Sequence, residues 1–115
     1  MKVLDTFTAT VYVGFHDRTT GFDHTIRQAE KICQEYCNRI GLCVTVTPTK
    51  FIYTNSNEYG VAIGFINYPR FPDDPEHIKK LAIELGGIFV KEFNQFKVSI
   101  VCSDKTYMVE RNNAG

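Results

Sequence analysis

The chain begins with a segment in which hydrophobic and polar residues alternate. From Phe7 to Phe15 the odd-numbered positions are apolar, whereas the even-numbered positions carry threonine, tyrosine or glycine. A period of two residues is typical of a strand that buries one face. The segment therefore predicts a half-buried strand, and the polar residues from His16 to Gly21 predict a loop after it.

A helical period follows this loop. Asp23 is a residue type that often caps the N-terminus of a helix, and Gly41 is suited to end one. The residues that recur between them every three or four positions are Ile26, Ala29, Cys33, Tyr36, Cys37 and Ile40. This pattern predicts a helix over residues 24–40.

A second segment with helical spacing follows a proline-rich connection, residues 69–75. Asp74 can cap this helix, and Pro75 fits its first turn because proline needs no N–H partner there. The apolar stripe consists of Ile78, Leu81, Ala82 and Leu85. The glycine pair at 86–87 predicts the end of the helix.

The two segments between the helices predict a β-hairpin. Residues 42–53 and 58–68 are rich in β-branched and aromatic side chains, and the Asn-Ser-Asn run at 55–57 is typical of a tight turn. Pro48 has no N–H to donate to a ladder, which indicates an edge strand or a bulge. The hairpin places Glu58 at the start of its second strand.

The C-terminal part of the chain predicts more strands. A short strand is expected over residues 88–93, a stronger one over 96–102 and a last one around 107–109. A Ser-Asp-Lys turn separates the last two strands. The polar tail, residues 111–115, is expected to fray.

The predicted order is strand, helix, strand, strand, helix, strand, with a terminal hairpin. This order is that of an α+β fold, a ferredoxin-like β-α-β-β-α-β sandwich with a C-terminal hairpin, in one domain of residues 1–115. Both helices should cover one face of an antiparallel sheet. Several strands carry apolar residues at both parities, so the second face needs a partner, and the simplest partner is another copy of the chain. These residues are Val44, Val46, Phe51, Ile52, Ile63, Phe65, Ile66, Val98, Ile100 and Val101.

Charge and composition narrow the classes of function. The chain has 13 basic and 13 acidic residues, and this formal net charge of zero argues against a nucleic-acid partner. A neutral chain also has little electrostatic repulsion against self-association. Residues 1–5 do not have the pattern of a signal peptide, and no segment has the roughly 18 apolar residues that a membrane span requires. We therefore expect a cytoplasmic protein that binds neither nucleic acid nor membrane.

The cysteines and histidines do not form a recognisable chemical motif. The cysteines are Cys33, Cys37, Cys43 and Cys102. They lack histidines at zinc-finger spacing, so we expect no metal and interpret them as buried, reduced thiols. His16 and His24 do not have the spacing of a two-histidine phosphoesterase, and the simpler interpretation is that they are loop and cap residues.

Glu58 is the carboxylate that stands out as a candidate for chemistry. It follows a turn and opens an apolar strand, in a chain without a phosphate loop or a nucleophile motif. Aromatic residues gather on the same hairpin and could stack on an adenine or lie near a cation: Phe51, Tyr53, Tyr59, Phe65 and Tyr68. The structural alternatives are a solvated strand end for the glutamate and core or interface packing for the aromatic residues.

The layout resembles the phage-encoded enzymes that destroy S-adenosylmethionine (SAM), known as SAM hydrolases and later interpreted as SAM lyases. The resemblance runs from about Phe7 to Val109. It rests on the Val-Tyr-Val run at 11–13, on Glu58 at the start of an alternating strand, on the Leu-Ala pair at 81–82 and on the closing hairpin. Tyr59 stands beside Glu58 where relatives carry adjacent acids.

The resemblance implies a homotrimer with a SAM site between subunits and no cofactor. Glu58 would be the key carboxylate, while Tyr53, Tyr59 and Phe51 would shape the site or stack on the substrate. The implied reaction is attack of the substrate's own carboxylate on its γ-carbon, which yields L-homoserine lactone and 5′-methylthioadenosine. In an infected host cell this reaction would deplete SAM and so counter restriction.

Three alternatives remain open at the level of sequence. A SAM hydrolase would use Glu58 as a general base toward water. A trimeric module of the nitrogen-regulatory-protein type would bind or sequester a small molecule, although the loops 16–22 and 69–75 hold one arginine each, Arg18 and Arg70, which argues against a polyphosphate ligand. A structural phage component would use the apolar sheet face for assembly alone.

Overall fold

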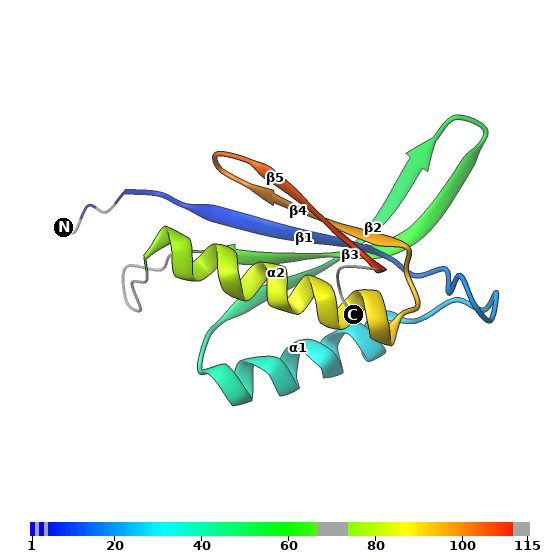
Figure 1. Cartoon of the computed structure of the whole chain (residues 1–115), viewed down its shortest axis with the longest axis horizontal. Helices are drawn as coiled ribbons and strands as arrows, with labels where there is room; N and C mark the ends of the chain where they lie inside the picture. Colours follow the sequence, from blue (N-terminus) through cyan, green and yellow to red (C-terminus); the bar gives the residue numbers. More distant parts are fainter. Residues whose placement is uncertain (2, 4, 67–73, 112–115) are drawn as a thin grey trace.

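A computed structural model shows a five-stranded antiparallel sheet with two helices packed on one face (Figure 1). The structure describes residues 1, 3, 5–66 and 74–111. Its elements are β1 (Thr8–Gly14), α1 (Ile26–Ile40), β2 (Val44–Tyr53), β3 (Ser56–Ile66), α2 (Pro75–Glu92), β4 (Lys97–Cys102) and β5 (Thr106–Glu110). The strand order is β2-β3-β1-β4-β5, and every neighbouring pair is antiparallel. The α+β class is confirmed, and this order is compatible with a ferredoxin-like sandwich that carries β5 at one edge.

The first helix begins with a capping box that differs from the prediction. Its N-cap is Thr25 and not Asp23: the Gln28 N–H donates to the Thr25 hydroxyl (3.3 Å), and the Thr25 N–H donates to the Gln28 side-chain oxygen (2.8 Å). Asp23 instead pairs with His16 in an isolated β-bridge before the helix. Gly41 ends α1 in the left-handed conformation (φ 81°), as its lack of a side chain permits.

The prediction that the glycine pair at 86–87 ends the second helix is wrong. α2 continues to Glu92, so the strand expected over residues 88–93 does not form. The apolar stripe extends to Phe89 and Val90, which are both buried against the sheet. Gly86 lies where the helix comes close to β4, since a Cβ atom there would be 3.0 Å from Cδ1 of Ile100. Tertiary packing therefore keeps this segment helical despite the weak helix propensity of glycine.

The hairpin between β2 and β3 is confirmed, with a shorter turn than expected. Tyr53 pairs with Ser56, so Thr54 and Asn55 form the turn, and Asn55 adopts a left-handed conformation (φ 60°). Glu58 is therefore the third residue of β3. Pro48 lies in β2 at the edge of the sheet, as its missing N–H predicted. Figure 1 shows that this hairpin extends past the other strands and turns away from the helices.

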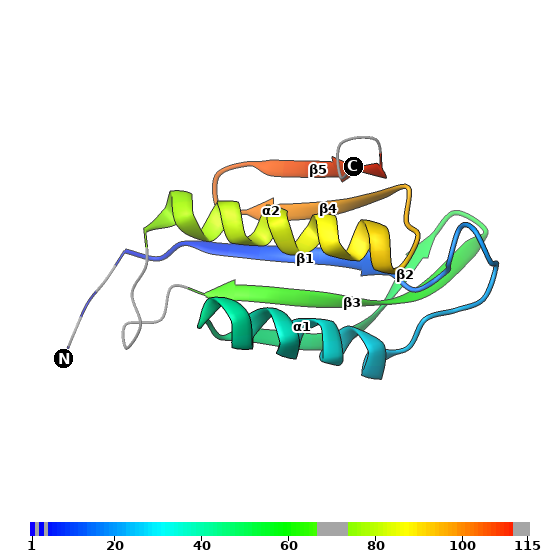
Figure 2. The same cartoon turned by 60° about the horizontal axis from the view of Figure 1, so that its bottom comes forward.

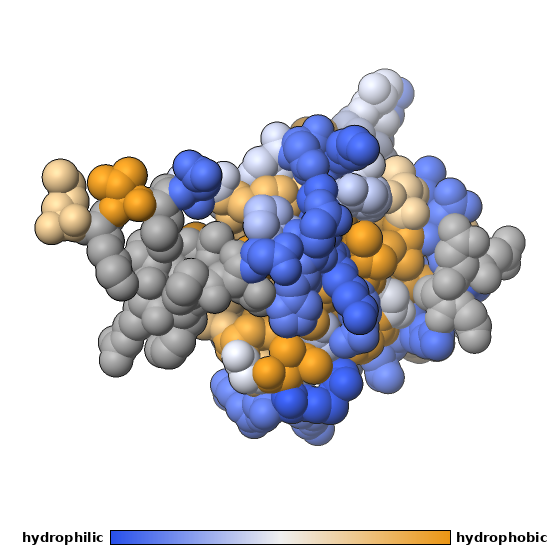
Figure 3. Space-filling model, turned by 60° about the vertical axis from the view of Figure 1, so that its left-hand side comes forward, coloured by the Kyte–Doolittle hydropathy of each residue, from blue (hydrophilic) through white to orange (hydrophobic). Residues whose placement is uncertain are grey.

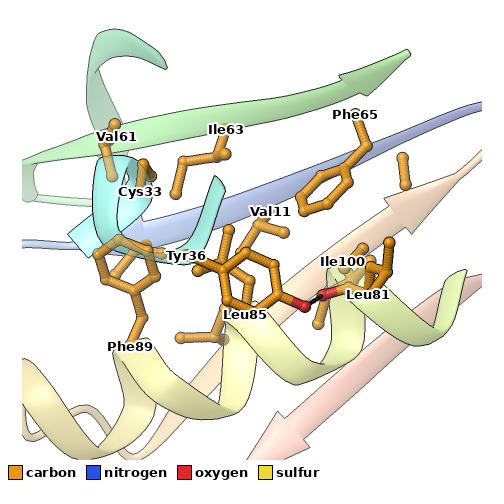
Figure 4. Packing of buried hydrophobic residues seen from close by; sticks show 14 of the residues in the cluster. Val11, Cys33, Tyr36, Val61, Ile63, Phe65, Leu81, Leu85, Phe89 and Ile100 are labelled. Atoms are coloured by element: carbon orange, nitrogen blue, oxygen red, sulfur yellow. Dashed lines mark hydrogen bonds between the residues drawn. The ribbon is translucent and has the colours of Figure 1, made fainter. Parts of the chain in front are cut away.

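The core lies between the helices and the helix-facing side of the central strands. Figure 2 shows α1 and α2 running side by side over the sheet, and Figure 4 shows the side chains between these layers. Tyr36 is the largest fully buried side chain of the described residues; its hydroxyl donates to the Glu84 carboxylate (2.8 Å) and also lies 3.2 Å from the Leu81 carbonyl oxygen. Burial, and after it the hydrogen bond to Glu84, raise the pKa of Tyr36 above its ordinary value. A fully buried aromatic ring with a satisfied hydroxyl joins the two helices.

The helix-free face of the sheet is less apolar than predicted. Val44, Val46, Phe65 and Ile100 point toward the helices, whereas Val101 points away from them. The strand pairing arranges two rows across this face: Thr45, Gly64, Thr10, Val101 and Thr106 in one, and Thr47, Ala62, Tyr12, Ser99 and Met108 in the other. We call these ten residues the uncharged rows, because none of them has a charged side chain and most are threonine, small or apolar residues.

The end of the molecule that carries Met1 has a different surface. In Figure 3, where the left-hand side of Figure 1 comes forward, hydrophilic residues form a broad band, with hydrophobic residues in smaller patches beside it. Neither α1 nor α2 has the length and apolar content that a membrane-spanning helix needs, and these are the helices of the described residues. Residues 67–73, which include Tyr68, Arg70 and most of the proline-rich connection, and residues 112–115 of the tail lie outside the described residues.

Candidate functional site

Glu58 lies at the base of the hairpin, beside the end of β1. Its carboxylate accepts two hydrogen bonds from the segment that follows β1. The His16 backbone N–H donates to Oε2 (2.9 Å), and Nη2 of Arg18 donates to Oε1 (3.0 Å). The Glu58 side chain is 14% exposed and that of Arg18 is 34% exposed, so both members of the ion pair are partly shielded from water. Each oxygen has one fixed donor and keeps further acceptor capacity.

Two glycines form the floor under Glu58 and Phe51. Gly14 in β1 pairs with Gly60 in β3, and both lie on the helix-free face of the sheet. A Cβ atom on Gly14 would overlap Oε2 of Glu58, whereas one on Gly60 would overlap the Phe51 ring and the Val13 carbonyl oxygen. The missing side chains therefore let the carboxylate and the ring lie flat against the backbone.

A cavity of about 440 Å³ lies beside Glu58. Its lining residues are His16, Arg18, Asp23, Tyr53, Ser56, Asn57, Glu58 and Tyr59. The structure thus brings together three of the four residues singled out from the sequence, Glu58, Tyr53 and Tyr59. The fourth, Phe51, pairs with Glu58 across the hairpin and makes an edge-on contact with Tyr12 (ring centroids 6.3 Å apart). It lies next to Glu58, over Gly60, and does not line the cavity.

The charges around the cavity are mixed. Asp23 pairs with the His16 ring (3.1 Å), and the Lys50 ammonium lies 4.9 Å from the centre of the Tyr59 ring. Tyr53 and Tyr59 are more than half exposed, so their ring faces and hydroxyls are available to a ligand. Carboxylates can hold an ammonium group, aromatic faces can stack on a base or approach a cation, and the remaining N–H groups of Arg18 can donate to an acceptor.

Sequence reasoning missed the contribution of the loop after β1. It assigned His16 and Arg18 to a polar loop with no role, because 40 or more residues separate them from Glu58 in the chain. The antiparallel pairing of β1 with β3 removes that separation, since Gly14 opposite Gly60 places the end of β1 next to Glu58. The two glycines, Gly14 at the end of β1 and Gly60 within β3, were the available signal, as glycine in a strand often marks a close approach.

The described residues hold no group of three or more His, Cys, Asp or Glu side chains that could bind a metal ion. All four cysteines are free thiols; Cys33 and Cys102 are buried, Cys37 is half-buried and Cys43 is exposed. The prediction of buried thiols is therefore wrong for Cys43. Burial raises the pKa of Cys33 to about 12, which keeps this thiol protonated and unreactive at neutral pH. None of the cysteines lines the cavity.

Two solved structures share the fold over almost the whole chain. One is a phage SAM lyase in complex with S-methyl-5′-thioadenosine, with a TM-score of 0.74, 18% sequence identity and coverage of 97% of this chain and 96% of that one. The other is a phage SAM lyase in the apo state, with a TM-score of 0.79, 20% identity and coverage of 96% and 94%. No family model and no curated protein sequence matches the chain. At this level of identity the likeness establishes the fold.

Proposed function

We propose that the chain is a SAM lyase of the phage type, which converts SAM to L-homoserine lactone and 5′-methylthioadenosine in the cytoplasm of an infected cell. The observation that carries the proposal is the full-length fold match to phage SAM lyases, one of them bound to the thioether product of this reaction. The cavity adds support, since it combines the carboxylate of Glu58 with the aromatic rings of Tyr53 and Tyr59. Removal of SAM would leave those restriction systems of the host that need SAM without it.

The proposed reaction needs few protein groups because SAM contains both reactants. An oxygen of its α-carboxylate attacks the γ-carbon, and the bond from that carbon to the sulfonium sulfur breaks. The bonding electron pair stays on sulfur, which leaves as a neutral thioether, so no proton moves. An enzyme that holds the substrate folded in this geometry gains up to about 7–11 kcal/mol in a well-oriented intramolecular reaction. The positive charge of sulfur disappears in the reaction, and a site with little water favours that change.

Each candidate residue has a defined role in this proposal. The Glu58 oxygens accept hydrogen bonds from the α-ammonium of SAM through the lone pairs that His16 and Arg18 leave free. This contact directs the substrate carboxylate toward the γ-carbon. Tyr53 and Tyr59 shape the cavity and offer their rings to the adenine or the sulfonium. Phe51 lies beside Glu58 across the hairpin and shapes the site without lining the cavity. No cofactor takes part, and SAM is the substrate.

We also propose a homotrimer in which the helix-free faces of the sheets meet. The uncharged rows favour such a contact, because burying them requires no charged group to lose its water. A formal net charge of zero also gives little repulsion between copies. The cavity opens on the hairpin that extends from this same sheet, so a neighbouring copy could complete it (Figure 1). The substrate would then bind between subunits.

The test is incubation of the purified chain with SAM, followed by product analysis at early times, before the lactone hydrolyses in water. Lactone and methylthioadenosine in equal amounts are expected. Homoserine formed without a lactone intermediate would identify a hydrolase, and tight binding without turnover would identify a sequestering module. Either result would overturn the proposed lyase.

Replacement of the key carboxylate tests the role of Glu58. Glu58→Gln should abolish turnover while sparing the fold, because the amide lacks the negative charge that holds the ammonium. Glu30→Gln makes the same chemical change on the exposed side of α1 and should keep the wild-type rate. Near-normal turnover by Glu58→Gln would show that another group positions the substrate.

A further inference from the structure

The segment after β1 has a residue that faces inward between two residues that face the cavity. His16 and Arg18 both bind Glu58, whereas Asp17, between them, is buried with its side chain only 4% exposed. Figures 1 and 2 show the segment from β1 to α1 beside the hairpin at one end of the sheet. The reaction proposed above gives Asp17 no role. Burial of a carboxylate is costly unless hydrogen bonds or charges compensate for the lost water.

Asp17 accepts four hydrogen bonds from three parts of the chain. Oδ1 accepts the backbone N–H groups of Thr19 and Thr20, both at 2.8 Å. Oδ2 accepts Nε2 of His24 (2.8 Å) and Nδ2 of Asn94 (2.9 Å). The N–H of Thr20 and then the Asn94 amide hold the pKa of Asp17 well below its ordinary value, against the opposing effect of burial. Asp17 is therefore an ionised acceptor at neutral pH, and its contribution to stability is lost as the pH falls through its folded-state pKa.

The same segment is tied to the turn between α2 and β4. The Gln95 side chain donates to the His16 carbonyl (2.6 Å), and the Arg18 N–H donates to the Asn94 carbonyl (3.1 Å). Gln95 is buried, and the His24 ring stacks in parallel on Phe93 at the end of α2, with centroids 4.2 Å apart. Asp17 is thus the point at which the segment after β1, the start of α1 and the end of α2 are joined.

We propose that Asp17 is a positioning residue for the site, which acts by fixing the two donors of Glu58. This inference rests on the proposed function, in which Glu58 holds the substrate. With Asp17 anchored inward, the backbone on either side is held so that the His16 N–H reaches Oε2 and the Arg18 guanidinium reaches Oε1. A carboxylate is required because it accepts all four donors at once, whereas an asparagine amide would present its own N–H groups to two of them.

The test compares Asp17→Asn with Asp104→Asn in the full-length protein. Asp104 is a matched control, since it also accepts a charged hydrogen bond, from Lys79 (2.6 Å), and has a lowered pKa with that bond as its main cause. It lies in the β4–β5 turn, at the other end of the sheet from the hairpin (Figure 1). Both variants should lose stability, and measurements are made at a temperature where both remain folded.

Two measurements separate positioning from a loss of stability. In Asp17→Asn, kcat for SAM should fall by about 10²-fold, as expected when a reacting group moves by about 1 Å, whereas Asp104→Asn should keep the wild-type kcat. The amide proton of His16, observed by NMR without substrate, should move upfield in Asp17→Asn as its bond to Glu58 lengthens, and should not move in Asp104→Asn.

The NMR measurement keeps this inference distinct from the proposed function. If the wild type does not turn over SAM, the proposed lyase fails, but the His16 amide still reports whether Asp17 holds the donors of Glu58. An unchanged His16 amide in folded Asp17→Asn overturns the inference. If Asp17→Asn does not fold, Asn94→Gly replaces it, because glycine accepts the positive φ of Asn94 (49°) while removing one donor to Asp17. That variant should shift the same resonance in the same direction, and no shift would count against the inference.

Discussion

At the scale of single residues, the site depends on the absence of side chains at two glycines as much as on the groups that line it. Glu58 can lie over the end of β1 because Gly14 has no side chain, and Phe51 can lie over β3 because Gly60 has none. Neither glycine is required for an unusual backbone conformation, since neither has a positive φ. Their role is to provide space, and that role predicts different outcomes at the two positions. A Cβ on Gly60 would meet backbone as well as a ring, whereas one on Gly14 would meet the end of a flexible side chain.

Gly14→Ala is expected to fold but to lose activity. The new methyl group would displace the Glu58 carboxylate, which can move without disturbing the sheet. A displacement of about 1 Å is expected to lower kcat for SAM by about 10²-fold. Steady-state kinetics and thermal unfolding of the same preparation check this result. Gly87→Ala, a glycine substitution in α2 away from the cavity, serves as the control, and equal kinetics for the two variants would contradict the arrangement.

At the scale of elements, α2 shows how packing overrides local signals. A glycine pair is a common helix end, yet the helix runs through it because the apolar stripe continues on both sides. The two glycines have different surroundings: a Cβ on Gly86 would lie 3.0 Å from Ile100, whereas a Cβ on Gly87 would meet nothing within 4 Å. The pair therefore combines one position that needs to be small with one that does not.

Gly87→Ala is expected to raise the free energy of unfolding by about 0.5–1 kcal/mol, because alanine has the higher helix propensity and open space surrounds it. Gly86→Ala should gain less, since Ile100 must move to accept the new methyl group. Urea unfolding of both variants and the wild type measures the difference. A loss of stability in Gly87→Ala would mean that the backbone there is not held as a helix.

At the scale of the whole molecule, the helix-free face of the sheet is the surface on which the proposed trimer would form. The uncharged rows span all five strands, and the cavity adjoins the hairpin that extends from the same sheet. A protein in which 23% of residues are charged would be expected to place charges on a large solvent-facing surface. The uncharged rows favour contact with other copies, and the proposed trimer rests on these rows, since Lys97 and Glu110 pair on the same face outside them.

Thr10→Lys is expected to convert a trimer into monomers with little effect on the fold. The substitution places a charge in the middle of the uncharged rows, and burying it between copies would be costly, whereas a monomer leaves it in water. Sedimentation analysis measures the change in mass, and turnover of SAM should fall with it. Gln34→Lys adds the same charge on the exposed side of α1 and should leave the trimer intact. A monomeric wild type at micromolar concentration would remove the basis for an intersubunit site.

The sequence by itself determined most of the elements from local patterns, but it also predicted a strand over residues 88–93, which belong to the end of α2 and its cap. Alternation predicted β1, strand-forming segments around a turn predicted the hairpin, and helical spacing predicted both helices. Pro48 indicated an edge strand or a bulge, and it lies in the edge strand. The sequence also singled out Glu58, Tyr53 and Tyr59, which line one cavity. Helix ends were less well defined: Asp23 and Thr25 are both suitable caps, and only one of them occupies the capping position.

Only the tertiary structure decided what surrounds these residues. The pairing of β1 with β3 brings His16 and Arg18 to Glu58 from 40 or more positions away, and Asn94 and Gln95 reach the same segment from the far end of α2. A local pattern contains no information about such contacts, because they depend on strand register and on the direction in which a buried side chain points. The period of a strand determines which face a residue occupies, whereas its neighbour across the sheet is set by the fold as a whole.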